Sequence, residues 1–233
     1  GDYNSSEFDQ LQKAADQISE EAGSLLLDRR AQPARLQSDL GFHLQYDFDS
    51  NRSDYKRASK GFKEPLARAL GLGRDVSRAI DLTMGLAIDS VFLSQYGLPI
   101  ISVERNYILH FLAREGQRVS LRPEIKSIQF IHNEALSFLK QHQVSRKEVV
   151  YFDPMYPEKK KKSALPRQEM QFFKRLVGTD QDAADVLLQA LEMNFFRVVV
   201  KRPLTSTALA RKPSFQIETK LVRYDVYQRQ QES

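Results

Sequence analysis

Apolar residues recur along the chain either every three or four positions, as in helices, or every second position, as in strands. Residues 1–61 have little regular pattern beyond one helix. Apolar residues recur every three or four positions over 7–22, which predicts an amphipathic helix. Strands are expected at 24–27 and 40–48, and the polar, basic segment 49–61 is expected to be a loop. Residues 1–61 are therefore predicted to form a small α+β extension, and no catalytic signal lies in them.

From residue 62 onward, strand-like and helical segments alternate. Strands are predicted at 77–82, 99–104, 125–132, 147–152, 195–200, 215–220 and 222–227, and helices at 62–72, 87–96, 106–115, 168–176 and 182–193, with a short one ending at 140. This alternation predicts a parallel sheet with right-handed crossovers. The very short link before the last strand predicts an antiparallel pair at the end. Residues 62–233 are therefore expected to form one Rossmann-like α/β domain with a seven-stranded, mostly parallel sheet.

The most informative motif is Asp153-Pro154-Met155-Tyr156-Pro157, which directly follows the predicted strand 147–152. Open α/β sheets bind their ligands at this end of their strands. The Asp153 carboxylate and the Pro154 carbonyl can accept hydrogens from a planar amine, while Tyr156 stacks on the attached base. Asp-Pro alone often marks only a turn. The complete string, in this position, predicts a catalytic site for an exocyclic amine.

Two further strand ends carry residues suited to a nucleoside-containing cofactor. A turn containing Asp81 and Gly85 follows the first strand of the domain, and Glu104 ends the next strand, 19 residues beyond Gly85. Glycine lets the backbone approach a ligand, and an acid about 20 residues later can accept both ribose hydroxyls. The glycine turn and Glu104 are each weak signals alone. Their positions on successive strand ends, followed by Asp153, favour a cofactor site. After the third strand, Asn133 or Glu134 can bond an adenine amine, and Asn133 can equally cap a helix.

Composition narrows the classes of protein. The chain has 233 residues, 41% of them hydrophobic, and no cysteine, which excludes disulfides, thiolate zinc sites and a cysteine nucleophile and fits a reducing interior. No apolar run is long enough for a membrane span and no signal peptide opens the chain, so a cytoplasmic protein is expected. His43, His110, His132 and His142 lack the spacing of metal ligands, and no metal is expected.

The net charge of +5 is compatible with a nucleic-acid partner, and its clustering is more informative. The cations next to the proposed site are Lys159, Lys160, Lys161, Lys162, Lys201 and Arg202, and a second cluster is Arg52, Lys56, Arg57, Lys60 and Lys63. A lysine run is as often a solvated face as a binding site. Its position directly after the Asp153 motif favours contacts with RNA phosphates.

Several strings together resemble one known family. They are Asp81-x-Thr83-x-Gly85-Leu86-x-x-Asp89, Glu104-Arg105-Asn106, Ile131-His132, the Asp153 motif, Lys162-Ser163-Ala164-Leu165, Glu169-Met170 and Val198-Val199-Val200-Lys201-Arg202-Pro203. They resemble the ribosomal RNA small subunit methyltransferase J family of bacterial guanine-N2 methyltransferases. The resemblance implies the class I methyltransferase fold, S-adenosylmethionine as cofactor, and a guanosine of 16S ribosomal RNA, free or in the assembled small subunit, as substrate.

The resemblance also implies positions for the cofactor. They are Ile88, Asp89, Glu104, Arg105, Glu134, Ala135 and Asp153, beside the turn that contains Asp81 and Gly85. The family usually has Ala-Gly-Leu-Gly-Arg-Asp in the first loop, and here Met84, Ala87 and Ile88 replace its alanine, second glycine and arginine. Loss of an arginine that bonds the cofactor carboxylate weakens binding by about 1–3 kcal/mol.

Three other functions compete with this hypothesis. Closely related motifs serve methyltransferases that act on adenine in DNA or RNA, or on a protein glutamine. The altered first loop is compatible with an RNA-binding module that no longer binds cofactor. A nicotinamide-dependent oxidoreductase is disfavoured because the lone Gly85 does not match the three-glycine fingerprint.

Overall fold

The computed structural model describes residues 5–22, 24–28, 30–39, 41, 43–50, 53–155, 173 and 176–228. Its centre is one seven-stranded sheet with the order β6-β5-β4-β7-β8-β10-β9. The strands are β4 (Arg78–Asp81), β5 (Ile100–Glu104), β6 (Gln129–His132), β7 (Glu148–Phe152), β8 (Arg197–Pro203), β9 (Phe215–Glu218) and β10 (Val222–Gln228). β10 runs antiparallel to both β8 and β9, while β4 to β8 are parallel. The predicted seven-stranded sheet with an antiparallel end is therefore confirmed.

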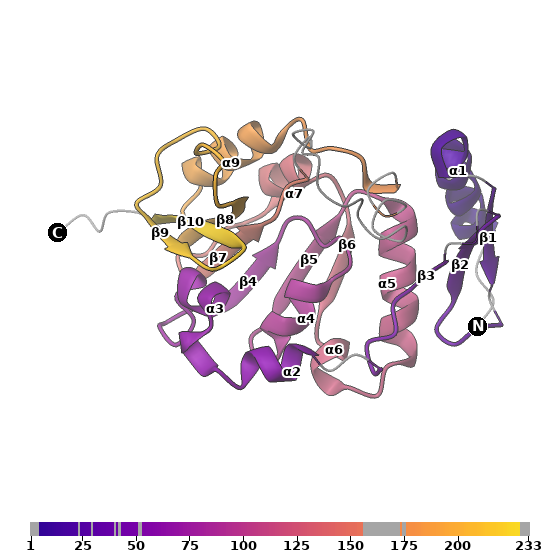
Figure 1. Ribbon diagram of the computed structural model, residues 1–233, viewed down its shortest axis with the longest axis horizontal. Helices are drawn as coiled ribbons and strands as arrows, with labels where there is room; N and C mark the ends of the chain where they lie inside the picture. The colour runs from indigo at the N-terminus through magenta and orange to yellow at the C-terminus, as the bar shows by residue number, and fades with distance from the viewer. Residues whose placement is uncertain are drawn as a thin grey trace.

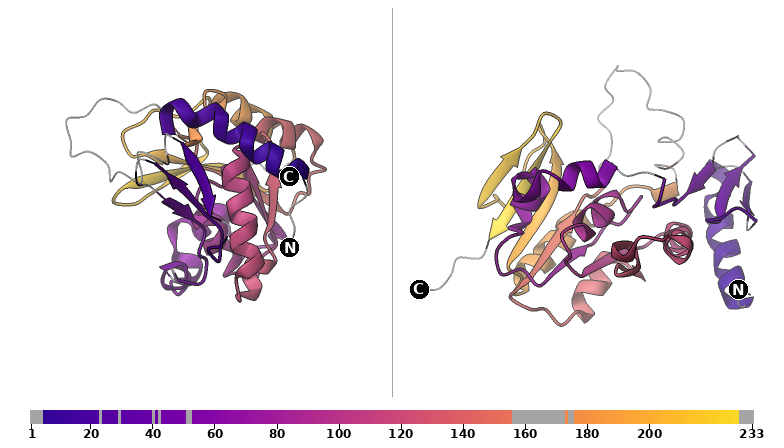
Figure 2. Two further views of the ribbon diagram at one scale, coloured as in Figure 1. Left: turned by 90° about the vertical axis from the view of Figure 1, so that its right-hand side faces the viewer. Right: turned by 90° about the horizontal axis from the view of Figure 1, so that it is seen from below.

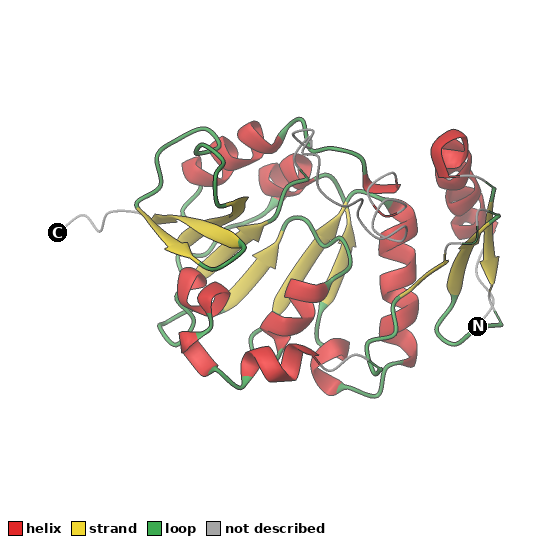
Figure 3. Cartoon of the chain, viewed as in Figure 1, coloured by secondary structure: helices red, strands yellow, loops and turns green. Residues whose placement is uncertain are grey.

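Helices cover both faces of this sheet (Figure 1, Figure 3). The helices are α2 (Ser53–Ala58), α3 (Pro65–Leu70), α4 (Ile88–Ser94), α5 (Tyr107–Val119), α6 (Pro123–Lys126), α7 (Ala135–Gln141) and α9 (Ala183–Glu192), with a 3₁₀ turn, η1, at Gly61–Lys63. Alternate residues of β7 face different cores: Val149 packs with α3, α4 and α5, and Val150 packs with α7 and α9. Burial on both faces explains the unbroken apolar run that predicted this strand.

The strand order places the ligand-binding edge between β4 and β7. From β4 the chain moves outward through β5 to β6, and then returns to place β7 on the other side of β4. Loops leaving the carboxyl ends of β4 and β7 therefore diverge there, which opens a crevice at the edge of the sheet. The residues predicted to act on ligands follow these two strands and β5.

A separate three-stranded sheet precedes the main domain. It has the order β1-β2-β3, from Leu25–Asp28, Arg35–Ser38 and His43–Gln45, and follows α1 (Ser5–Ala22). Figure 1 shows α1 and β1 to β3 beside α5, and Figure 2 shows the same arrangement from two other sides. The segment that joins the two parts lies on α5, because a Cβ at Gly116 would collide with the Tyr46 carbonyl. Tyr46 and Phe48 are buried in the core of the main domain.

Several predicted elements were wrong. The strand expected at 40–48 is only β3, β2 was not predicted, and residues 125 and 126 of the strand expected at 125–132 belong to α6. The segment 49–61, expected to be a loop, contains α2. The sequence of α2 is polar and has no apolar stripe, so periodicity could not reveal a helix that tertiary contacts stabilise.

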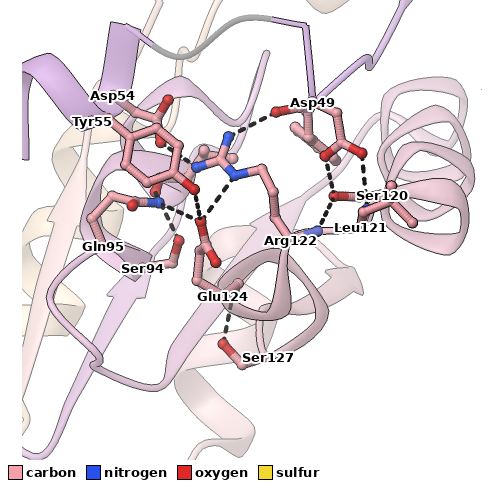
Figure 4. Close-up of polar contacts among 12 residues, drawn as sticks. Asp49, Asp54, Tyr55, Ser94, Gln95, Ser120, Leu121, Arg122, Glu124 and Ser127 are labelled. Carbon is pink, nitrogen blue, oxygen red and sulfur yellow. Dashed lines mark hydrogen bonds and ion pairs between the residues drawn. The ribbon is translucent and has the colours of Figure 1, made fainter.

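A buried polar cluster supplies those contacts and fixes α2 to α6 (Figure 4). The Arg122 guanidinium is 5% exposed, forms an ion pair with Asp54 of α2, and donates to Glu124 Oε1 at 2.9 Å and to the Phe48 carbonyl at 2.7 Å. Tyr55 donates to the same Glu124 oxygen at 2.6 Å. Burial favours a higher pKa for Glu124, but hydrogen bonds from Tyr55 and Arg122 outweigh it and lower this pKa to about 2.

Replacing Arg122 by methionine is expected to lower the free energy of unfolding by about 3–5 kcal/mol, because Asp54 would be left buried without its counter-charge. Urea denaturation measures the change. Lys147→Met is the matched control, since Lys147 pairs with Asp75 at the surface, where the two side chains are 56% and 80% exposed, and such pairs contribute about 0–1 kcal/mol. Equal effects of the two substitutions would contradict this role of the Arg122 cluster.

Within the part of the chain that the structure describes, no helix combines the length and the apolar character needed to cross a membrane. In the same described ranges, no group of three or more histidine, cysteine, aspartate or glutamate side chains could hold a metal ion.

Candidate active site

The loop after β4 is held in a shape that exposes its backbone. Gly85 has a φ of +49°, which favours glycine, and its N–H donates to Glu104 Oε2 at 2.9 Å. The Tyr46 hydroxyl donates to the Gly85 carbonyl at 2.5 Å. Ala87, which stands where the resembled family has a second glycine, has a φ of +57°. The loop therefore has glycine-type geometry at both positions and is pinned from both sides.

Glu104 connects the ends of β4 and β5. It is 5% exposed, and its second oxygen accepts from the Asn106 N–H at 2.8 Å. Burial raises the pKa of Glu104 to about 7, although the two backbone hydrogen bonds oppose this shift. A carboxylate in this position is ready to gain stabilisation from a ligand that donates hydrogen bonds to it.

Asp81 supports the same loop from beneath. Its two oxygens accept from the Thr83 N–H at 3.1 Å and from the Ser90 hydroxyl at 2.6 Å. Burial raises the pKa of Asp81 to about 7. Asp81 also lies on the cavity wall, so its predicted contact with a cofactor stays a prediction.

The loop after β7 is fixed at both ends and presents Asp153. The Asp153 N–H donates to Thr83 Oγ1 at 2.7 Å. Two residues later, Met155 and Asp180 bond reciprocally, with the Met155 N–H at 2.6 Å from Asp180 Oδ2 and the Asp180 N–H at 3.0 Å from the Met155 carbonyl. Pro154 is buried between these anchors. The Asp153 side chain is 40% exposed, so its carboxylate is accessible.

A chain of alternating charges runs through the site. Lys201 Nζ of β8 lies 2.7 Å from Asp153 Oδ2 and 3.4 Å from Asp89 Oδ2 at the start of α4. The Tyr151 hydroxyl donates to Asp89 at 2.6 Å, and Arg57 of α2 donates to it at 2.8 Å. Three elements distant in sequence thus meet at Asp89.

The pKa values of the two carboxylates have opposite net shifts, because Asp89 has two neighbouring cations and Asp153 has one. Burial favours a higher pKa for Asp89, but Lys201 and Arg57 outweigh it, and the net pKa is lowered. Burial also raises the pKa of Asp153, and there the single cation Lys201 does not fully offset it. Lys201 itself has a raised pKa, because attraction to Asp89 and Asp153 exceeds the cost of its burial. The group remains an ammonium at neutral pH.

All these side chains surround one cavity of about 380 Å³, a volume typical of small-molecule sites. The predicted residues on its wall are Asp81, Gly85, Ile88, Asp89, Glu104, Arg105, Glu134, Ala135, Asp153 and Pro154. Glu134, rather than Asn133, is the N-cap residue of α7 and lies on the wall, so the alternative of a cap at Asn133 was wrong. Arg105 forms an ion pair with Asp180 at 2.7 Å.

Lys201 and Arg202 do not lie where they were predicted. The run Val198–Val200 was expected to end the strand, but the antiparallel ladder with β10 continues β8 to Pro203. Lys201 therefore faces the cavity, while Arg202 is 5% exposed and donates to the Thr207 carbonyl at 2.7 Å. Their predicted contacts with flanking RNA phosphates stay predictions. Tyr156 and Lys159 to Lys162 lie outside the described residues.

Arg57 is one of the wall residues that the sequence did not reveal. It was one cation among several in a presumed loop, inside a segment expected to carry no site residue. Beyond its contact with Asp89, it pairs with Glu64 at 3.0 Å, and its guanidinium stacks 4.0 Å from the Phe92 ring centre. Arg57 reaches the cavity wall only because α2 folds as a helix. No local sequence pattern distinguishes Arg57 from Lys56 or Lys60.

Comparison with known proteins is consistent with this geometry. The model of a SAM-dependent methyltransferase family matches residues 10–229. A ribosomal RNA small subunit methyltransferase J from Bdellovibrio bacteriovorus is 45% identical over 186 residues, which cover 79% of this chain and 73% of that protein. The protein of the same name from Thioalkalivibrio sulfidiphilus is 38% identical over 194 residues, covering 79% of this chain and 75% of the relative.

Among solved structures, a SAM-dependent methyltransferase from Neisseria gonorrhoeae superposes with a TM-score of 0.65 at 30% identity. The match covers 86% of this chain and 81% of that one. The residues matched by the family model, 10–229, span the seven strands of the described sheet and the residues that line the cavity.

Proposed function

Since the chain belongs to the SAM-dependent methyltransferase family, among the relatives named ribosomal RNA small subunit methyltransferase J, we propose that it methylates the exocyclic N2 amine of a guanosine in 16S ribosomal RNA. The observation that carries the proposal is the position of Asp153. Its carboxylate follows β7, is 40% exposed, and opens into the same cavity as the glycine turn and Glu104. An acceptor for an amine and a cofactor pocket thus share one space.

The residues of the cavity fit S-adenosylmethionine. Its ribose hydroxyls are donors, which suits the Glu104 carboxylate, and its amino and sulfonium groups are cationic, which suits a wall that is rich in acids. Glu134 and Ala135, which follow β6, would lie at the adenine. In the resembled family an arginine stands at the position of Ile88. Arg57, from α2, also lies on the wall and is a cation.

When bound, S-adenosylmethionine supplies an electrophilic methyl group, and the protein has to position the amine and receive its proton. Asp153 and the Pro154 carbonyl would accept the two N–H bonds of the guanine amine and direct its lone pair toward the methyl group. Burial raises the pKa of Asp153, which makes its carboxylate a better proton acceptor as the amine loses a hydrogen. Lys201 keeps that carboxylate ionised before transfer.

Tyr156 completes the proposal as the stacking partner of the base, although it lies outside the described residues. Stacking on an aromatic ring contributes about 1–3 kcal/mol. That is comparable to the few kcal/mol needed to unstack a nucleotide and turn it into a site. Lys159 to Lys162, also outside the described residues, would bind flanking phosphates.

The substrate can be identified with tritiated S-adenosylmethionine. Purified small ribosomal subunits, protein-free 16S ribosomal RNA, DNA and a mixed protein fraction are incubated separately with the enzyme. We expect label only in ribosomal RNA, recovered as N2-methylguanosine after nuclease digestion. Label in adenosine, DNA or protein would instead identify one of the other amine methyltransferases.

Replacing Glu104 by glutamine is expected to weaken binding of S-adenosylhomocysteine about 10- to 100-fold, because hydrogen bonds to a charged acceptor contribute about 1.5–3 kcal/mol. Isothermal titration calorimetry measures the affinity, and Glu218→Gln, exposed on β9, is the control. Since the pKa of Glu104 is about 7, wild-type affinity should rise from pH 6 to pH 8 as the carboxylate ionises. That rise should be smaller in the Glu104→Gln variant. If this variant bound S-adenosylhomocysteine as tightly as wild type, the role of Glu104 in cofactor binding would be contradicted.

A further inference from the structure

Exposed positive charges are clustered on α2, η1, α3 and the turn that follows α3. Its exposed cations are Lys56, Lys60, Lys63, Arg68 and Arg74. The acid in the stretch 55–74 is Glu64, which is buried, caps α3 by accepting from Leu66 and Ala67, and pairs with Arg57. The α2–α3 surface, defined by these five cations, therefore has a local positive potential, and Asp75, the exposed acid next to Arg74, forms an ion pair with Lys147 at 2.7 Å.

One aromatic ring is fixed in an exposed position within this surface. Phe62 is 55% exposed and stacks on Tyr96 with ring centres 5.7 Å apart. The Tyr96 hydroxyl donates to the Gly61 carbonyl at 2.9 Å, which holds the turn that carries Phe62. The ring lies so close over Gly73 that a Cβ there would be 2.9 Å from it. The protein thus holds a large apolar side chain at the surface and between lysines.

Phe62 also borders a cleft of about 370 Å³. The cleft is lined by Phe62, Arg68, Arg74, Arg197, Phe215 and Ile217, among others. Phe215 is 38% exposed, and the Arg197 guanidinium lies 5.4 Å from its ring centre. Arg197 is itself fixed by the Ala69 carbonyl at 3.0 Å and by Gln228. Two accessible rings and the exposed guanidinium groups of Arg68 and Arg74 are chemically suited to a nucleobase and its phosphates, while Arg197, which is 5% exposed, forms part of the cleft wall.

This surface begins at the active site. Arg57 lies on α2 between Lys56 and Lys60 in sequence, and its side chain reaches the wall of the catalytic cavity. Figure 1 shows α2 and α3 along one side of the domain, with α3 beside the β9–β10 hairpin that carries Phe215. The cleft lies at Arg197, where β8 begins, and Lys201 of the same strand lies on the wall of the catalytic cavity.

We propose that the α2–α3 surface binds a single-stranded RNA segment that flanks the target nucleotide, with one base in the cleft between Phe62 and Phe215. The proposal rests on the proposed function for its substrate. Lys60 and Lys63 contact phosphates on one side of that base, and Arg68 and Arg74 contact phosphates at the cleft. Stacking on a ring tolerates any base, so this surface supplies affinity and register, and not sequence recognition.

The test uses the full chain and a fluorescein-labelled 20-nucleotide oligouridylate, with affinity measured by fluorescence anisotropy. Phe62→Ala is expected to weaken binding about 5- to 150-fold, and Phe62→Tyr to retain it. Lys60→Ala/Lys63→Ala should weaken binding and reduce the slope of log affinity against log salt by about 1.4, or about 0.7 per lost phosphate contact. Lys140→Ala/Lys220→Ala removes the same charge from exposed positions on α7 and after β9, and should leave the slope unchanged.

Methyl transfer to small ribosomal subunits separates this proposal from the proposed function. We expect the Phe62 and lysine variants to raise KM for the subunit while kcat and the affinity for S-adenosylhomocysteine remain within about twofold of wild type. If wild type methylates the subunit and these variants match it in KM and in oligouridylate binding, the RNA surface is elsewhere. If wild type itself transfers no methyl group to ribosomal RNA, the proposed function fails, whatever the oligouridylate result.

Discussion

Asp153→Ala is expected to lower the rate of methyl transfer to ribosomal RNA about 10²- to 10⁴-fold, the range for loss of a positioned proton acceptor. The Asp153 carboxylate is the accessible acceptor at the end of β7, and its main chain is fixed by Thr83 at 2.7 Å. The backbone of the turn should therefore remain in place while the acceptor is lost. A single-turnover assay with pre-bound cofactor measures the chemical step directly.

Two controls separate chemistry from binding. Asp153→Asn preserves the shape and one acceptor oxygen but cannot take a proton, so it should lie between wild type and Asp153→Ala. RNA affinity should stay within about twofold in both variants, because the α2–α3 surface and the other cations are untouched. A single-turnover rate equal to wild type in Asp153→Ala would remove the basis of the proposed mechanism.

The arrangement of the main domain was predictable because its strands are buried on both faces. Segments such as Glu148–Phe152 are continuous apolar runs, and the motifs that follow them mark the ligand-binding edge. Where an apolar run ended, the prediction ended too. β8 continues through Lys201 and Arg202 because pairing with Tyr224 and Arg223 of β10 extends the ladder, and pairing partners are not visible in a local pattern.

The same distinction applies to the site. Gly85, Glu104 and Asp153 could be predicted because they lie in the loop after β4, at the last residue of β5 and directly after β7, and parallel strands end at one edge. Arg57 could not, because its position depends on a short polar helix that the buried pair Asp54–Arg122 holds in place. Long-range ion pairs of this kind leave no periodic trace in a single sequence.

The continuation of β8 brings Lys201 to the wall of the candidate active site, where we infer that it positions Asp153. Side chains alternate along a strand, so Lys201 shares the face of Val199, toward α4, and Arg202 takes the other face. Its ammonium lies between Asp153 and Asp89, 2.7 Å and 3.4 Å away. Without it, two carboxylates would repel each other in a buried site with only Arg57 and Tyr151 to compensate Asp89.

Lys201→Met is therefore expected to lower kcat at pH 7 about 100-fold, with a shifted pH profile as the diagnostic result. Burial already raises the pKa of Asp153, and Lys201 is the cation that opposes this shift. Removing Lys201 raises this pKa further, so a larger fraction of Asp153 is protonated at pH 7 and unable to accept the amine hydrogen. Activity should recover as the pH rises toward 9, and Lys201→Arg should restore most of it at pH 7. A purely structural role would instead lower kcat equally at every pH, and that result would contradict the positioning of Asp153 by Lys201.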